Sequence, residues 1–122
     1  MLEAAEARQL LDSIDASTPV GLRDRALIAL MVFSFARVGA ALAMRVDDVH
    51  VQHRRLWVRL REKGGKAHAM LCHHTLEVYL HAYLEGTGIA SEPKGPLFRT
   101  IARGTGQLSA MPLPQANAPT PT

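Results

Sequence analysis

Residues 26–44 read ALIALMVFSFARVGAALAM, an apolar run that a single charged residue, Arg37, interrupts. Apolar side chains on all sides predict a central helix over about residues 21–35, packed by neighbours on several faces. A guanidinium cannot be deprotonated and is costly to bury unpaired, so Arg37 must reach solvent, a carboxylate or a bound anion. Gly39 permits a sharp redirection, which predicts a short helix at 38–44 with Arg37 held at the corner. The plainer alternative is an arginine at a helix end that reaches solvent over apolar neighbours.

Helical periodicity predicts two further helices around this centre. Residues 2–15 and 75–86 each carry apolar side chains at the spacing of one buried helix face. Thr18–Pro19 is typical of a helix start, because threonine caps the first turn and proline supplies its fixed φ. The two tyrosines of the chain, Tyr79 and Tyr83, lie one turn apart on the apolar face of the last helix. Core packing is therefore the prediction for both.

A basic hairpin follows the helical part. Residues 54–61, RRLWVRLR, alternate between an apolar face and a face of arginines and tryptophan, as a half-buried strand does. Gly64–Gly65 can form the tight turn, residues 67–71 supply the returning strand, and residues 46–51 add a third strand. The sequence therefore predicts an α+β fold, mostly helical, with a small three-stranded antiparallel sheet.

Charge is unevenly distributed along the chain, whose net charge is +3. Residues 1–50 carry five basic and seven acidic side chains, whereas residues 51–122 carry nine basic and four acidic ones. Most of the excess lies on the predicted hairpin, between residues 54 and 66. A concentrated basic patch favours a polyanion as partner. The alternative is a strand face that is merely solvated.

Five segments, taken in order, resemble the first half of the catalytic domain of the tyrosine recombinases, the phage-integrase family. That family has an RDRALL…TGLR…LRW-x-D-I block followed by a GKGGK hairpin. The corresponding segments here are LRDRAL at 22–27, FARV at 35–38, LAMRVDDV at 42–49, REKGGK at 61–66 and, more weakly, GPLFRT at 95–100.

The resemblance implies DNA strand exchange through a covalent phosphotyrosyl link, with double-stranded DNA as the partner. Arg37 matches the first catalytic arginine of the family, which holds the phosphate. By position Lys63 matches the hairpin lysine, which protonates the departing 5′ oxygen as a general acid. The remaining basic residues of the hairpin are predicted to contact DNA, with His68 on its basic face; they are Arg55, Arg59, Arg61, Lys66 and His68.

Two departures from the family pattern limit what this chain can do alone. Ala40 stands where the family usually has a carboxylate three residues after the arginine. The His-x-x-Arg box and the nucleophilic tyrosine, which lie downstream in the family, have no match in these residues. We therefore interpret residues 1–111 as a partial integrase-like catalytic domain, inactive alone, and residues 112–122 as a proline-rich disordered tail.

Other functions find less support in the sequence. The six histidines form no recognisable ligand set with Cys or carboxylates, so neither a metal nor another cofactor is predicted. The single cysteine, Cys72, cannot form an intrachain disulfide, and together with the acidic start of the chain it predicts a cytoplasmic protein. The longest apolar run, residues 26–36, is too short to cross a bilayer, so no membrane span is predicted. No feature indicates a small-molecule substrate. The alternative function is a non-catalytic interaction protein that self-associates or binds an intact recombinase through exposed apolar surface.

Overall fold

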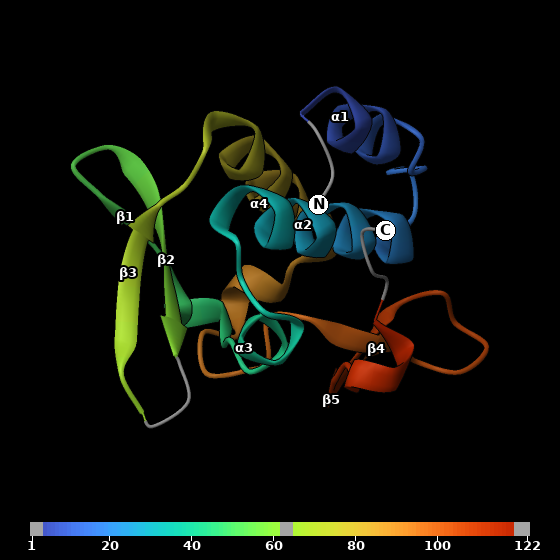
Figure 1. Cartoon of the computed structure of the whole chain (residues 1–122). Helices are drawn as coiled ribbons and strands as arrows, with labels where there is room; N and C mark the ends of the chain where they lie inside the picture. The colour runs from blue at the N-terminus through green and yellow to red at the C-terminus, as the bar shows by residue number, and fades with distance from the viewer. Residues whose placement is uncertain (1–3, 62–64, 119–122) are drawn as a thin grey trace.

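Three of the four helices of the computed structural model pack around the longest one (Figure 1). The structure describes residues 4–61 and 65–118. α2 lies along α4, α1 covers one side of it, and α3 follows it after a sharp corner. The fold is α+β, as predicted. The helices are α1 (Ala4–Asp12), α2 (Pro19–Ser34), α3 (Val38–Leu42) and α4 (His74–Thr87).

The boundaries of α2 explain where the corner falls. The Thr18 side chain accepts a hydrogen bond from the backbone N–H of Gly21, and Pro19 occupies the first turn, so the predicted start is confirmed. At the other end the helix stops at Ser34, and Phe35 adopts the left-handed conformation, with φ 53° and ψ 28°. This residue turns the chain so that Ala36 and Arg37 lead directly into α3.

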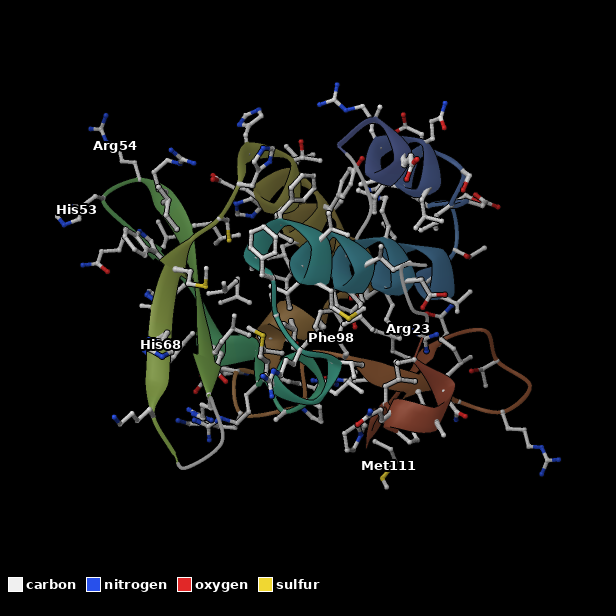
Figure 2. The ribbon with its side chains drawn as sticks, in the orientation of Figure 1. Arg23, His53, Arg54, His68, Phe98 and Met111 are labelled. Atoms are coloured by element: carbon white, nitrogen blue, oxygen red, sulfur yellow. The ribbon has the colours of Figure 1, made fainter. Side chains whose placement is uncertain are left out.

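The three-stranded sheet is antiparallel in the order β1-β2-β3. Residues 46–48, predicted as strand, instead form a turn of 3-10 helix that ends in the buried carboxylate of Asp48. The β1–β2 turn consists of His53 and Arg54, both with positive φ, and Figure 2 shows both side chains projecting away from the body. The strands are β1 (Val49–Gln52), β2 (Arg55–Arg61) and β3 (Ala67–Leu71).

The core lies where α2, α4 and the apolar face of β2 meet. Tyr83 is fully buried, stacks on Phe98 with 5.8 Å between ring centroids, and donates a hydrogen bond from its hydroxyl to the Leu97 carbonyl at 2.6 Å. Tyr79 is half-buried, with the guanidinium carbon of Arg25 4.2 Å from its ring centroid. Both tyrosines therefore serve packing, as predicted. The hydrogen bond of Tyr83 also ties α4 to the segment before β4.

Two buried arginines connect the central helix to the C-terminal part of the chain. Arg23 of α2 donates a hydrogen bond from Nη1 to the carbonyl of Arg99 at 3.0 Å and pairs with Asp24 at 2.9 Å. Arg99, which is 2% exposed, donates to the Pro96 carbonyl at 2.7 Å and pairs with Glu92 at 3.2 Å. Each of the two guanidinium groups thus has a carboxylate partner and a backbone carbonyl acceptor.

The C-terminal part contains more structure than the sequence indicates. The prediction of one short strand near residue 99 is met by β4 (Arg99–Ile101), which pairs with β5 (Leu108–Pro112). Leu113 is 4% exposed and joins the core, and a 3-10 helix, η3 (Gln115–Asn117), follows. Residues 112–118 of the predicted tail therefore include the end of β5, the buried Leu113 and η3. Residues 119–122 lie outside the described residues.

Candidate nucleic-acid interface

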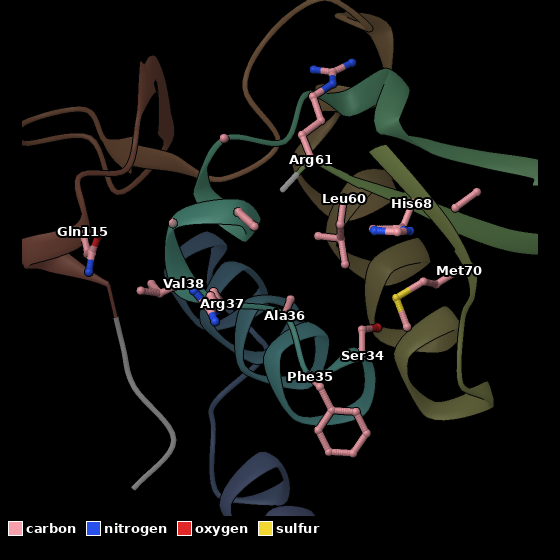
Figure 3. A pocket seen from close by; sticks show the side chains of 14 residues that line it. Ser34, Phe35, Ala36, Arg37, Val38, Leu60, Arg61, His68, Met70 and Gln115 are labelled. Atoms are coloured by element: carbon pink, nitrogen blue, oxygen red, sulfur yellow. The ribbon is translucent and has the colours of Figure 1, made fainter. Parts of the chain in front are cut away.

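A cavity of about 1120 Å³ lies between the α2–α3 corner and the β2–β3 hairpin. Arg37 and Phe35 line it on the corner side, and Arg61 and His68 line it on the hairpin side (Figure 3). Gln115 of η3 closes a third side, next to α3. None of the described residues that line the cavity is acidic, so its lining favours an anionic occupant.

Arg37 is exposed at the corner, immediately before α3. Its backbone is extended, with φ −73° and ψ 148°, and its carbonyl accepts a hydrogen bond from Ala41 N–H at 3.0 Å, which fixes the backbone. No described residue accepts a hydrogen bond from its guanidinium, and Ala40 supplies no carboxylate. The sequence predicts such a corner, and in the structure the guanidinium is available to a ligand.

Arg59 and Arg61 are held by a single buried carboxylate. Asp48 is 0% exposed; its Oδ1 lies 3.2 Å from Arg61 Nη2 and 3.6 Å from Arg59 Nη1, and its Oδ2 accepts from Arg45 N–H at 3.0 Å. Both arginine side chains remain about 40% exposed. They are therefore positioned cations with a compensating charge, which differs from the open basic face that the sequence suggests.

Arg55 is paired as well, at the opposite end of β2. Its Nε lies 3.2 Å from Glu77 Oε2, and its Nη2 donates to the carbonyl of Cys72 at 3.2 Å. Lys66 is exposed at the start of β3. Lys63, the predicted general acid, lies outside the described residues. The predicted DNA-binding residues of the hairpin therefore occupy different environments, and only Arg61 and His68 among them line the cavity with Arg37.

His68 lies on the other face of the sheet from the one predicted. The register pairs His68 with Leu60 and Arg61 with Ala67, and residues paired across an antiparallel ladder share a face. His68 therefore shares the face of the apolar residues of β2, not that of Arg55 and Arg59. The prediction that His68 lies on the basic face is therefore wrong, because the register across the turn, and not the hairpin's charge pattern, decides the face. On this face His68 lines the cavity, opposite the Arg37 corner (Figure 3).

Sequence reasoning missed two residues that shape this region. The sequence gives no indication that Asp48 is buried, because aspartate side chains are usually exposed. Phe35 did give a signal, because the similar TGLR block of the recombinases has glycine where this chain has phenylalanine. Glycine is the common residue at the left-handed end of a helix.

Among the described residues that line the cavity, no side chain is a strong nucleophile. Cys72 is 1% exposed, and burial raises the pKa of its thiol to about 12, so the thiol is protonated at neutral pH. Burial likewise raises the pKa of Tyr83. Within the described residues no group of three or more His, Cys, Asp or Glu side chains could hold a metal ion. No described helix combines the length and apolarity needed to cross a bilayer.

Comparison with known proteins relates the whole fold to recombinases. The tyrosine recombinase XerD of Listeria innocua is 32% identical over 85 residues, covering 70% of this chain and 28% of XerD. XerD of Corynebacterium glutamicum is 41% identical over 68 residues, covering 53% of this chain and 22% of that protein. The crystal structure of the XerH site-specific recombinase bound to palindromic difH substrate, a post-cleavage complex, matches 94% of this chain and 32% of XerH, with a TM-score of 0.64 and 25% identity.

The chain spans less than a third of the length of these relatives. The model of the phage integrase family matches residues 1–105, most of the sequence. The α2–α3 corner and the three-stranded sheet both fall within this match. The chain therefore belongs to the phage integrase family of tyrosine recombinases.

Proposed function

We propose that this chain supplies a DNA-binding face of a tyrosine recombinase catalytic domain, with Arg37 binding a backbone phosphate of duplex DNA. The observation that carries the proposal is the Arg37 guanidinium, which has no described partner and lines a cavity whose described lining residues include no acidic side chain. Two parallel N–H groups of a guanidinium match two non-bridging phosphate oxygens. In phosphoryl transfer the same contact would stabilise the negative charge that develops on these oxygens.

The hairpin residues would contribute in different ways. Lys66 is exposed and can contact a phosphate as a point charge. Arg61 lines the cavity while Asp48 fixes its position, so it can add a second contact without losing its ion pair. Lys63 remains the proposed general acid on the strength of the family resemblance. Arg55 and Arg59 would add long-range attraction more than direct contacts, because each has a carboxylate partner.

Replacing Arg37 by alanine is expected to weaken the binding of a labelled duplex about tenfold at low salt, the loss typical of a hydrogen bond to a charged group. The slope of log K against log salt concentration should fall by about 0.9, because one phosphate contact is lost. Fluorescence anisotropy over a salt series measures both quantities. Wild-type binding is expected in the range of about 10⁻⁴ to 10⁻⁶ M at physiological salt, as for sequence-independent duplex binding.

The matched control for this measurement is Arg103→Ala. Arg103 is exposed in the loop between β4 and β5, outside the cavity, so the variant has the same net charge as Arg37→Ala. Its affinity for the duplex should remain close to that of the wild type. Equal losses in the two variants would mean that net charge, and not the Arg37 corner, drives the binding.

The same proposal predicts binding without cleavage by these 122 residues alone. Neither tyrosine lines the cavity, since Tyr83 is buried against Phe98 and Tyr79 packs under Arg25. A nicked suicide duplex should therefore give no covalent adduct on a denaturing gel, because strand transfer needs an activated nucleophile. An adduct that disappears in Tyr79→Phe or Tyr83→Phe would contradict the proposal and identify the attacking residue.

A further inference from the structure

Phe35 combines an unfavourable backbone conformation with an exposed side chain. Its φ of 53° places it in the left-handed region, where a bulky residue is an outlier and glycine is the usual choice. Its ring does not compensate by packing, because the side chain is 73% exposed, more than any other large apolar side chain that the structure describes. Strained residues of this kind persist where a function requires them.

The other two phenylalanines of the chain show what packing would look like. Phe33 stacks on the ring of His73, with 4.2 Å between centroids and 7° between planes. Phe98 is fully buried, and Figure 2 shows it inside the fold below α2. Phe35 has neither arrangement, so its ring contributes little to the stability of the fold. Its exposed face is free for a ligand.

The position of Phe35 indicates what that ligand is. Figure 3 shows its ring at one end of the cavity and Arg61 at the other, with Arg37 on the wall between them. An occupant that satisfies this lining needs an anionic group for the arginines and a flat apolar face for the ring. A nucleotide has both. A second copy of this chain is less suited, because it carries the same net charge of +3.

We propose that Phe35 is a base-stacking residue, which takes an unpaired nucleobase beside the phosphate bound by Arg37. The inference rests on the function proposed for Arg37. Within intact duplex both faces of each base are covered by neighbouring bases, so the ring can stack only on a base that has left the helix. A cationic groove with an aromatic platform is the combination that binds single-stranded nucleic acid. The cavity then prefers melted or gapped DNA to intact duplex.

The test compares two labelled oligonucleotides of the same sequence, one fully paired and one with a short central bubble that contains 2-aminopurine. The wild type is expected to bind the bubble about tenfold more tightly than the duplex and to change the 2-aminopurine fluorescence, because the base leaves its stacked neighbours. Phe35→Ala should lose both the preference and the fluorescence change, while its affinity for the duplex stays unchanged. Phe35→Trp should retain both, because indole stacks at least as well.

The thermal stability of a Phe35 variant separates base stacking from a structural role of the ring, because loss of a structural ring would lower the Tm. Phe35→Gly relieves the left-handed conformation, so its Tm is expected to rise by about 4 °C while the bubble preference disappears. The control is Met111→Ala, which removes another exposed apolar side chain, 65% exposed on β5 and outside the cavity (Figure 2). This variant should keep the preference of the wild type.

Three results would overturn the inference, and they are distinguishable from one another. Equal bubble preference in the wild type and Phe35→Ala would refute base stacking alone and leave the Arg37 proposal intact. Failure of the wild type to bind either oligonucleotide would refute both proposals. A concentration-dependent dimer in sedimentation that Phe35→Ala abolishes, with DNA binding unchanged, would assign the ring to a protein interface.

Discussion

Asparagine in place of Asp48 is expected to lower the free energy of unfolding by about 3 kcal/mol, at the lower end of the range for a broken buried ion pair. The carboxylate is completely buried and serves Arg59, Arg61 and the backbone N–H of Arg45. An amide keeps the shape but loses the charge, and its own N–H groups would face the guanidinium groups. The loss stays at the lower end because both arginines are partly exposed and can regain water.

Urea denaturation followed by circular dichroism measures this difference. The neighbouring Asp47→Asn is the matched control, because Asp47 pairs with Lys94 and Arg45, whose side chains are 80% and 41% exposed. Its free energy of unfolding should change little, as expected for a solvent-screened ion pair. Similar values for the two variants would show that the Asp48 pairs are worth no more than surface contacts.

Alanine in place of Gly21 is expected to destabilise the protein by about 3 kcal/mol, although alanine is the better helix former. A Cβ at this position would overlap the backbone carbonyl of Asp15. The preceding loop would have to move, and the cap that Thr18 provides to the Gly21 N–H would be lost with it. Thermal and urea unfolding of the variant measure the effect.

Gly39→Ala is the control that separates this clash from helix propensity. Gly39 is also helical, but among the described residues a Cβ there would meet no atom nearer than Gln115 Oε1, at 4.0 Å. We expect a gain of about 0.5 kcal/mol, as for glycine to alanine inside a helix. If Gly21→Ala also gained stability, the loop before α2 would be far more adaptable than its geometry indicates.

The parts of the fold that the sequence predicts are those set by local chemistry. Thr18 and Pro19 define the start of α2, and the alternation at Leu56, Val58 and Leu60 defines the buried face of β2. Each depends on residues within one turn or one strand. The corner at Arg37 was predictable for the same reason, since an arginine within an apolar run must lie where its guanidinium reaches solvent or a partner.

The parts that the sequence did not predict depend on pairing between distant residues. The face on which His68 lies is decided by the register across the β2–β3 turn, and a shift of one residue reverses it. The burial of Asp48, in the 3-10 turn before β1, depends on two arginines of β2. The order of residues 113–118 depends on Leu113 reaching the core. Local pattern contains none of this information.

The contact between Arg23 and the Arg99 carbonyl has a consequence for synthesis on the ribosome. The two residues are 76 positions apart. The Arg23 guanidinium therefore lacks this carbonyl acceptor until residue 99 has left the ribosomal exit tunnel. Contacts of such long sequence separation form late, because a large loop must close first. Until α4 and residue 99 have emerged, α2 of the nascent chain is covered only in part, by α1 and α3, and chaperones can bind its remaining apolar surface.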